Sequence, residues 1–140
     1  MFTQIIIGSA LIVVTVIIEA AFIGMAIAVL NRHGPNLLTG HRIIKMTVFI
    51  TGITLWMVAA LSIAVWLWAV TFIVLDLFAL PEDALYFAAV SFTTLGFGDV
   101  LLEKPWWLLS GFSAANGLIL FSLTTAFLFE AFARLQVKQE

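Results

Sequence analysis

Three long apolar stretches, separated by short polar segments, dominate the sequence. The first covers Phe2 to Leu30, the second Ile43 to Leu80 and the third Trp106 to Phe132. A helix needs about 20 predominantly apolar residues to cross the hydrocarbon core of a bilayer. Because each stretch reaches that length, the pattern predicts an all-α membrane protein with three transmembrane helices.

The second stretch is long enough to raise the possibility of two spans. However, no Gly or Pro lies between Ile53 and Leu80, and two spans with a turn would need more residues. We therefore expect one helix over residues 42–75, either tilted or extending beyond the bilayer.

A fourth, shorter helix is predicted before the third stretch. Pro81, followed by Glu82 and Asp83, is typical of a helix start, because proline suits the first helical position and acidic side chains favour the positive end of the helix dipole. A helix over residues 82–93 is too short to span a membrane.

Composition agrees with the membrane class. Of the 140 residues 64% are hydrophobic and 10% are charged, whereas soluble domains carry about 25% charged residues. The chain has no cysteine, which excludes disulfide and thiolate chemistry. No metal-ligand cluster, catalytic triad or nucleic-acid-binding patch stands out, so we expect no enzyme activity, no organic cofactor and no nucleic-acid partner.

The charges are distributed unevenly along the chain. Basic residues flank the first loop and lie in the C-terminal tail: Arg32, Arg42, Lys45, Arg134 and Lys138. The segment between the second and third spans carries Asp76, Glu82, Asp83, Asp99 and Glu103 against Lys104. By the positive-inside rule, the loop at 31–41 and the tail at 134–140 are cytoplasmic. We expect a multi-pass plasma-membrane protein with its N-terminus outside.

Between the short helix and the last span lies the segment Thr94-Leu95-Gly96-Phe97-Gly98-Asp99. Non-helical backbone at membrane depth is tolerated only where it is buried in protein or lines a water-filled path. A short helix and a loop between two spans therefore indicate a pore or a cavity. The plain alternative is a glycine-rich turn between two helices.

Over about Ile43 to Leu135 the sequence resembles the pore module of the tetrameric potassium-channel superfamily: an outer helix, a pore helix, a TxGYGD or TxGFGD filter and an inner helix. The resemblance implies a pore domain at 42–135, with the filter at 94–99 and the inner helix at 106–133, preceded by an additional helix at 1–30. It also implies a homotetramer in membrane lipid that conducts monovalent cations. Potassium ions would bind carbonyl rings formed by four copies of Thr94, Leu95, Gly96 and Phe97.

The residue types suit such a filter. A potassium ion that sheds its water needs carbonyl oxygens aimed at one axis, whereas the carbonyls of an ordinary strand alternate in direction. Gly96 and Gly98 can adopt positive φ without a Cβ penalty. We expect the side chains of Leu95 and Phe97 to point away from the axis and to pack against their surroundings.

Filter support is expected to be unusual. Val90 stands four residues before Thr94, where some members of the superfamily have a glutamate behind the filter. We expect the Tyr86 hydroxyl to reach Asp99 as a substitute brace. The alternative is that Tyr86 is an interfacial aromatic residue without a filter role.

The last span carries candidates for a cavity wall or a gate. Asn116, Leu120 and Thr124 recur every four residues and so share one stripe of a helix. Ser113 could join them, and Gly117 is a candidate hinge. The alternatives are interhelical hydrogen bonding by Asn and Thr and close packing at Gly117.

Glu19 is an acidic residue deep within the first span. Ionisable residues there are costly and mark function by default, so one hypothesis is a proton-sensitive gating element. The other is a neutral, hydrogen-bonded glutamic acid that joins two helices. Ala20, Gly24 and Ala28 form a small-residue face, by which we expect this helix to pack on the outer helix of its own or a neighbouring subunit.

The sequence therefore predicts a potassium-selective pore subunit. Two alternatives stay open: a weakly selective cation channel, whose filter has lost binding sites, and a non-conducting membrane interaction subunit that keeps the pore fold.

Overall fold

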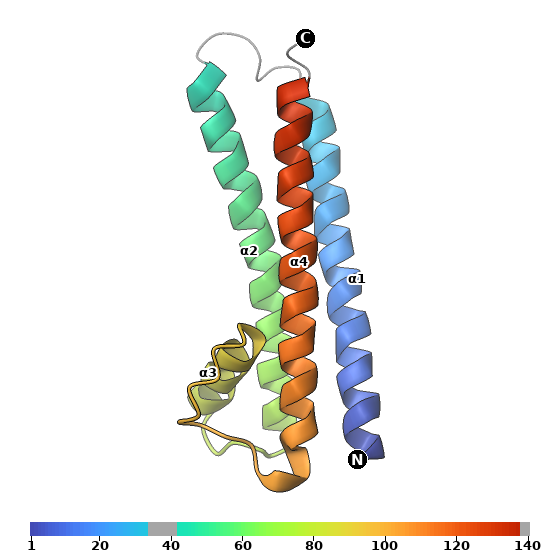
Figure 1. Ribbon diagram of the computed structural model, residues 1–140, viewed down its shortest axis with the longest axis vertical. Helices are drawn as coiled ribbons and strands as arrows, with labels where there is room; N and C mark the ends of the chain where they lie inside the picture. Colours follow the sequence, from blue (N-terminus) through green and yellow to red (C-terminus); the bar gives the residue numbers. More distant parts are fainter. Residues whose placement is uncertain (34–41, 138–140) are drawn as a thin grey trace.

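The computed structural model describes residues 1–33 and 42–137, and this part of the chain is helical without any strand. The elements are α1 (Phe2–His33), α2 (Arg42–Val74), α3 (Pro81–Phe92), the short 3-10 helix η2 (Lys104–Trp106) and α4 (Trp107–Val137). The long helices α1, α2 and α4 run side by side, and α3 lies against one end of α2 (Figure 1). The predicted all-α fold is confirmed.

Among the described residues, three helices are long and apolar enough to cross a membrane, over Phe2–Arg32, Ile44–Val74 and Lys104–Arg134. The second stretch forms one unbroken helix. It ends where Asp76 adopts a φ of 56°, since a residue in the left-handed region cannot continue an α-helix. Most of the predicted cytoplasmic loop (34–41) and the end of the tail (138–140) lie outside the described residues.

The larger hydrophobic core lies where α2, α3 and α4 meet. Phe72 of α2 packs edge-on against Phe87 of α3, with ring centroids 5.3 Å apart. Trp68 and Phe92 are fully buried in the same cluster. Because large aromatic side chains dominate packing energetics, this cluster fixes the position of α3, and with it the loop that follows.

Helix α1 packs against both α2 and α4. Phe22 stacks on Trp56 of α2 with ring centroids 4.7 Å apart, as the sequence led us to expect for the outer helix. Trp56 Nε1 also donates to the carbonyl of Phe22 at 3.1 Å. The polar side chains of α1 bond the α4 side: Gln4 donates to the carbonyl of Pro105, and Thr15 bonds Asn116. The sequence therefore predicted the contact of α1 with α2 but not its contact with α4.

The packing face of α1 also differs from the expected one. Its buried residues recur at alternating spacings of four and seven: Gln4, Gly8, Thr15, Glu19, Ala26 and Leu30. The small residues Ala20, Gly24 and Ala28 are exposed. Thr15 and Glu19 form hydrogen bonds with α4, and the face that carries them therefore lies against α4 while the small-residue face turns outward.

Candidate functional site

The segment Thr94–Asp99 follows α3 directly and is tied to the last turn of that helix. The carbonyl oxygen of Val90 accepts hydrogen bonds from the backbone N–H groups of Leu95 at 3.0 Å and Gly96 at 3.4 Å. The carbonyl of Ser91 accepts from the N–H of Thr94 at 2.9 Å. Val90 thus holds the loop through its backbone, a contact that its side-chain type does not reveal.

Backbone conformation alternates along this loop. Thr94, Gly96 and Gly98 have φ values of 60°, 55° and 79°, whereas Leu95 and Phe97 between them do not have positive φ. The positive φ expected at the two glycines is confirmed. Thr94 was not expected there, because a residue with a Cβ enters the left-handed region only at an energetic cost.

The side chains of Leu95 and Phe97, which lie between these positions, are largely uncovered by the rest of the described chain. Leu95 is 61% exposed and Phe97 is 67% exposed. They are two large apolar side chains on an irregular loop, one on each side of Gly96. This loop therefore presents apolar surface that the rest of the described chain leaves largely uncovered.

A side-chain hydrogen bond joins α3 to Asp99, the last residue of this segment. The Tyr86 hydroxyl on α3 donates to Asp99 Oδ2 at 2.6 Å, while Asp99 Oδ1 accepts from the N–H of Val100 at 3.0 Å. The hydrogen bond from Tyr86 lowers the pKa of Asp99 below its ordinary value, and the same bond raises the pKa of Tyr86. The contact expected from the sequence is present.

A second anchor follows the loop and was missed by the sequence analysis. Trp107 Nε1 donates to the carbonyl of Leu102 at 2.8 Å, and Leu102 is buried in the main core. The signal available in the sequence was the Trp pair at the start of the last span, since indole N–H groups usually find a partner when partly buried.

The residues of α4 that were expected to line a cavity lie against the other helices of the same chain. Asn116 is buried and bonds Thr15 of α1 in both directions, at 2.8 and 3.0 Å. Thr124 donates to Glu19 at 2.5 Å. Ser113 and Leu120 are fully buried as well. This corresponds to the alternative of interhelical hydrogen bonding, because α1 covers this side of α4.

Gly117 is a point of close approach. A Cβ atom placed there would lie 1.8 Å from the carbonyl oxygen of Phe92, the last residue of α3. At Gly111, by contrast, a Cβ would meet no atom within 4 Å. Gly117 therefore lets α4 pass directly against the end of α3, beneath the loop that carries the glycines. Its expected hinge role remains a prediction.

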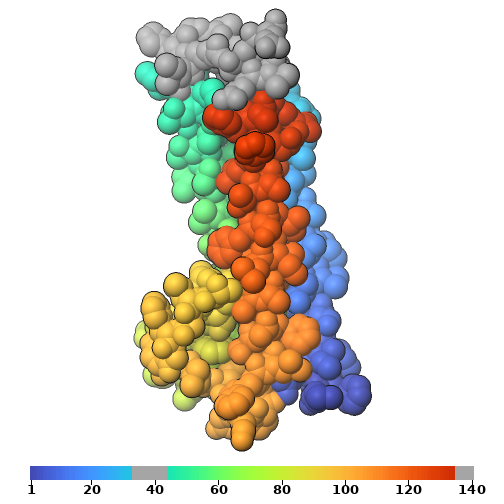
Figure 2. All heavy atoms as spheres, in the orientation of Figure 1, coloured from blue at the N-terminus to red at the C-terminus, as the bar shows by residue number. Residues whose placement is uncertain are grey.

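The face of α4 that is not covered carries other residues. Exposed positions recur along it at spacings of three and four: Gly111, Ala115, Leu118, Ser122, Thr125 and Phe129. Most of them line an open hollow of about 570 Å³. In the space-filling view α4 lies uncovered along the front of the molecule, with α3 and its loop beside it (Figure 2). The polar members, Ser122 and Thr125, were missed in the sequence.

Glu19 is the acidic group buried among these helices, with 1% of its surface exposed. Its Oε1 accepts the hydrogen bond of Thr124, and its Oε2 has no partner among the described residues. In the part of the chain that the structure describes, no group of three His, Cys, Asp or Glu residues is placed to hold a metal ion.

Comparison with known families matches this arrangement to one of them. The family model described as "Ion channel" matches residues 60–134, just over half of the chain, from the middle of α2 through α3 and the loop to the end of α4. Comparisons with curated proteins and with solved structures gave no match. Together with its three apolar helices, the match makes the chain an integral membrane protein. It belongs to the ion channel family.

Proposed function

We propose that the chain is the pore subunit of a homotetrameric, potassium-selective channel, with Thr94 to Gly98 as its selectivity filter. The observation that carries the proposal is the alternation of φ along this loop, positive at Thr94, Gly96 and Gly98. Alternating signs of φ turn successive carbonyl groups toward one side of the chain, whereas an extended strand points them to opposite sides.

The fixed backbone supports the same function. The N–H groups of Leu95 and Gly96 donate to the carbonyl of Val90 and hold this part of the loop in place. The carbonyl oxygens of Leu95 and Gly96 are then available to bind a cation. The loop also begins at the C-terminal end of α3, where the helix dipole is negative. A dehydrated cation is favoured at such a place.

The exposed side chains of Leu95 and Phe97 support assembly. One chain supplies a single set of carbonyls, and a ring needs several copies around an axis. In a tetramer the two side chains pack against a neighbouring subunit, so that their exposure in a single chain disappears. Packing of this kind would keep the ring at a constant diameter.

The acidic segment around the loop supports cation conduction. Asp76, Glu82, Asp83, Asp99 and Glu103 stand against Lys104 in the segment between α2 and α4. Four copies would surround the pore mouth with negative potential and concentrate cations there. By the positive-inside rule this mouth faces outward, and the N-terminus does so as well.

The uncovered face of α4 supplies the best candidate for a cavity wall. A hydrated cation at the membrane centre needs a wet and partly polar surface. Ser122 and Thr125 are exposed on this face, whereas Asn116 and Thr124 are engaged with α1. We therefore assign the cavity to the series that contains Ser122 and Thr125.

Flux from reconstituted vesicles tests the proposal. Vesicles that contain the purified chain and are loaded with K⁺ are expected to discharge when a proton ionophore balances the charge, and vesicles loaded with Na⁺ are not. Equal discharge of both ions would instead identify a weakly selective cation channel. Discharge of neither would identify a non-conducting membrane subunit.

A matched pair of variants connects the flux to the filter. Gly96→Ala places a Cβ on a residue with a φ of 55°, whereas Gly24→Ala changes an exposed glycine of α1 with open space around it. We expect K⁺ flux to be abolished in the first variant and retained in the second.

A further inference from the structure

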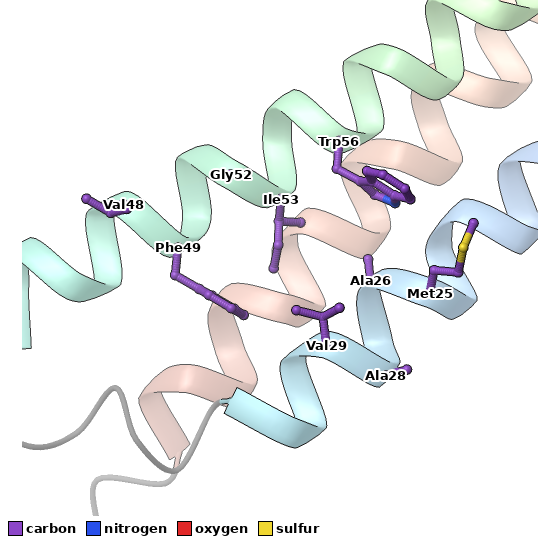
Figure 3. A pocket seen from close by; sticks show the side chains of 9 residues that line it. All are labelled: Met25, Ala26, Ala28, Val29, Val48, Phe49, Gly52, Ile53 and Trp56. Carbon is purple, nitrogen blue, oxygen red and sulfur yellow. The ribbon is translucent and has the colours of Figure 1, made fainter.

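An apolar groove separates α1 from α2 near the ends that carry the first loop. It encloses about 680 Å³, within the range of about 300–1,000 Å³ typical of small-molecule sites. Ala28 and Val29 line it from α1, and Gly52 and Trp56 line it from α2, with α4 behind (Figure 3). The described residues that line it include no charged side chain.

Small residues of both helices border the groove. A Cβ at Gly52 would meet no atom within 4 Å, so open space begins at the helix backbone itself. Ala28 adds little volume on the opposite wall. The stacked pair Phe22 and Trp56 holds the helices together at one end of the groove.

The position of the groove determines what can enter it. Its lining residues lie within the spans Phe2–Arg32 and Ile44–Val74, so the surrounding solvent is the hydrocarbon of the bilayer. The occupant must therefore be soluble in lipid along most of its length.

Two cationic residues lie beyond the end of the groove that is nearer the first loop. Arg32 follows Val29 by three residues on α1, and Lys45 precedes Val48 by three residues on α2; both are exposed. Residues three apart share a helix face, and one helical turn rises about 5.4 Å. Each cation therefore lies about one turn beyond the apolar lining, on the groove side of its own helix.

We propose that this groove binds an anionic glycerophospholipid. One acyl chain lies along Gly52 between α1 and α2, and the phosphate accepts hydrogen bonds from Arg32 and Lys45. An apolar slot that ends in two cations matches the chemistry of such a lipid from tail to headgroup. A zwitterionic lipid also fits the groove, but its headgroup is attracted less strongly by the two cationic residues. The proposal does not depend on the ion selectivity of the channel.

Native mass spectrometry of the assembled protein tests the site. The protein is released from bilayers that contain equal amounts of phosphatidylglycerol and phosphatidylcholine, and the lipids retained per subunit are counted. The wild type is expected to retain phosphatidylglycerol at several times the level of phosphatidylcholine.

Substitutions at two glycines test the binding of the acyl chain. Gly52→Phe fills the groove, while Gly24→Phe places the same side chain on an exposed part of α1 that also has open space and does not line the groove. We expect Gly52→Phe to lose the retained lipid and Gly24→Phe to keep it. Ala28→Leu, which narrows the groove from α1, should lose it as well.

For the headgroup, the double variant Arg32→Gln with Lys45→Gln should bind both lipids equally. Arg134→Gln, which removes an exposed cation of α4, should keep the preference. Equal retention of both lipids by the wild type would overturn the proposal, as would equal loss in Gly52→Phe and Gly24→Phe. A groove without lipid would indicate that another subunit covers it.

Discussion

The Tyr86 hydroxyl lies 2.6 Å from Asp99 Oδ2 and donates a hydrogen bond to it. This contact joins the middle of α3 to the residue that ends the glycine-containing loop, and so bridges the whole of Thr94 to Gly98. The carbonyl of Val90 holds the beginning of the loop. Together the two contacts attach both ends of the loop to the same helix.

Removal of the Tyr86 hydroxyl should loosen the outer end of the loop. Tyr86→Phe keeps the aromatic ring, so we expect the fold and the assembly to be unchanged while K⁺ currents decay faster and Na⁺ permeates more readily. Single-channel recording in bilayers, with K⁺ and Na⁺ on opposite sides, measures both quantities. Ser110→Ala, which removes a hydroxyl from the start of α4, is the control. Unchanged decay and selectivity in Tyr86→Phe would show that the contact is not a brace.

The same contact should depend on pH in a defined window. The stabilisation that the hydrogen bond gives through Asp99 is present above the ordinary Asp99 pKa of 3.8. It is lost as pH falls through the lowered pKa of the folded state. It is present below the ordinary Tyr86 pKa of 10.0 and is lost as pH rises through the raised pKa. Between these limits the contribution should be constant.

Carbon-13 NMR of the Asp99 carboxyl group checks this expectation, with Asp99→Asn used to assign the resonance. In Tyr86→Phe the midpoint of the titration should move up toward the ordinary value, because the hydrogen bond that favours the carboxylate is gone. A midpoint that does not move would mean that the bond is absent in the membrane.

Close packing at Gly117 should make it sensitive to a single methyl group. Gly117→Ala forces a Cβ into the carbonyl of Phe92, and a backbone group cannot move aside as a flexible side chain can. We expect a loss of about 1–3 kcal/mol in the free energy of unfolding. Gly111→Ala meets no atom and should gain about 0.5–1 kcal/mol from its higher helix propensity. Denaturation of both variants in detergent measures the difference, and equal stability would contradict the close approach.

The buried pair Glu19 and Thr124 should contribute to the attachment of α1. Thr124→Val preserves the shape of the side chain but removes the donor, which leaves both oxygens of Glu19 without a described partner. An unsatisfied buried polar group costs about 1–3 kcal/mol. Thr125→Val, on the exposed face of the same helix, should cost much less. The comparison uses the same denaturation assay, and a similar loss in both variants would count against the pair.

Glu19→Gln separates the two roles considered for this residue. If Glu19 only joins α1 to α4, a glutamine that still accepts from Thr124 should leave the pH dependence of the current unchanged. If Glu19 responds to protons, the pH dependence of the current should be lost in this variant. Current recorded between pH 5 and 8 in both proteins decides between them.

Much of the architecture could be predicted from local properties of the sequence. The three spans follow from the lengths of apolar stretches, and α3 follows from Pro81 and its acidic first turn. The positive φ of Gly96 and Gly98 follows from glycine itself, because backbone sterics act within a residue. The sequence also resembled a channel pore module, and the match of residues 60–134 to the ion channel family agrees with this resemblance at the level of an ion channel.

Only the tertiary structure decided which face of each long helix is covered. Helix α4 has polar residues on two sides, and Asn116 with Thr124 fits a cavity wall as well as Ser122 with Thr125 does by composition. Helix α1 covers the first pair, because Thr15 bonds Asn116 and Glu19 bonds Thr124, partners that lie more than 100 residues away in sequence. Such pairings depend on how helices pack, which neither periodicity nor propensity encodes. The sequence by itself therefore determined the helices and the residue types of the loop. The packing of the helices determined which face of each one is buried.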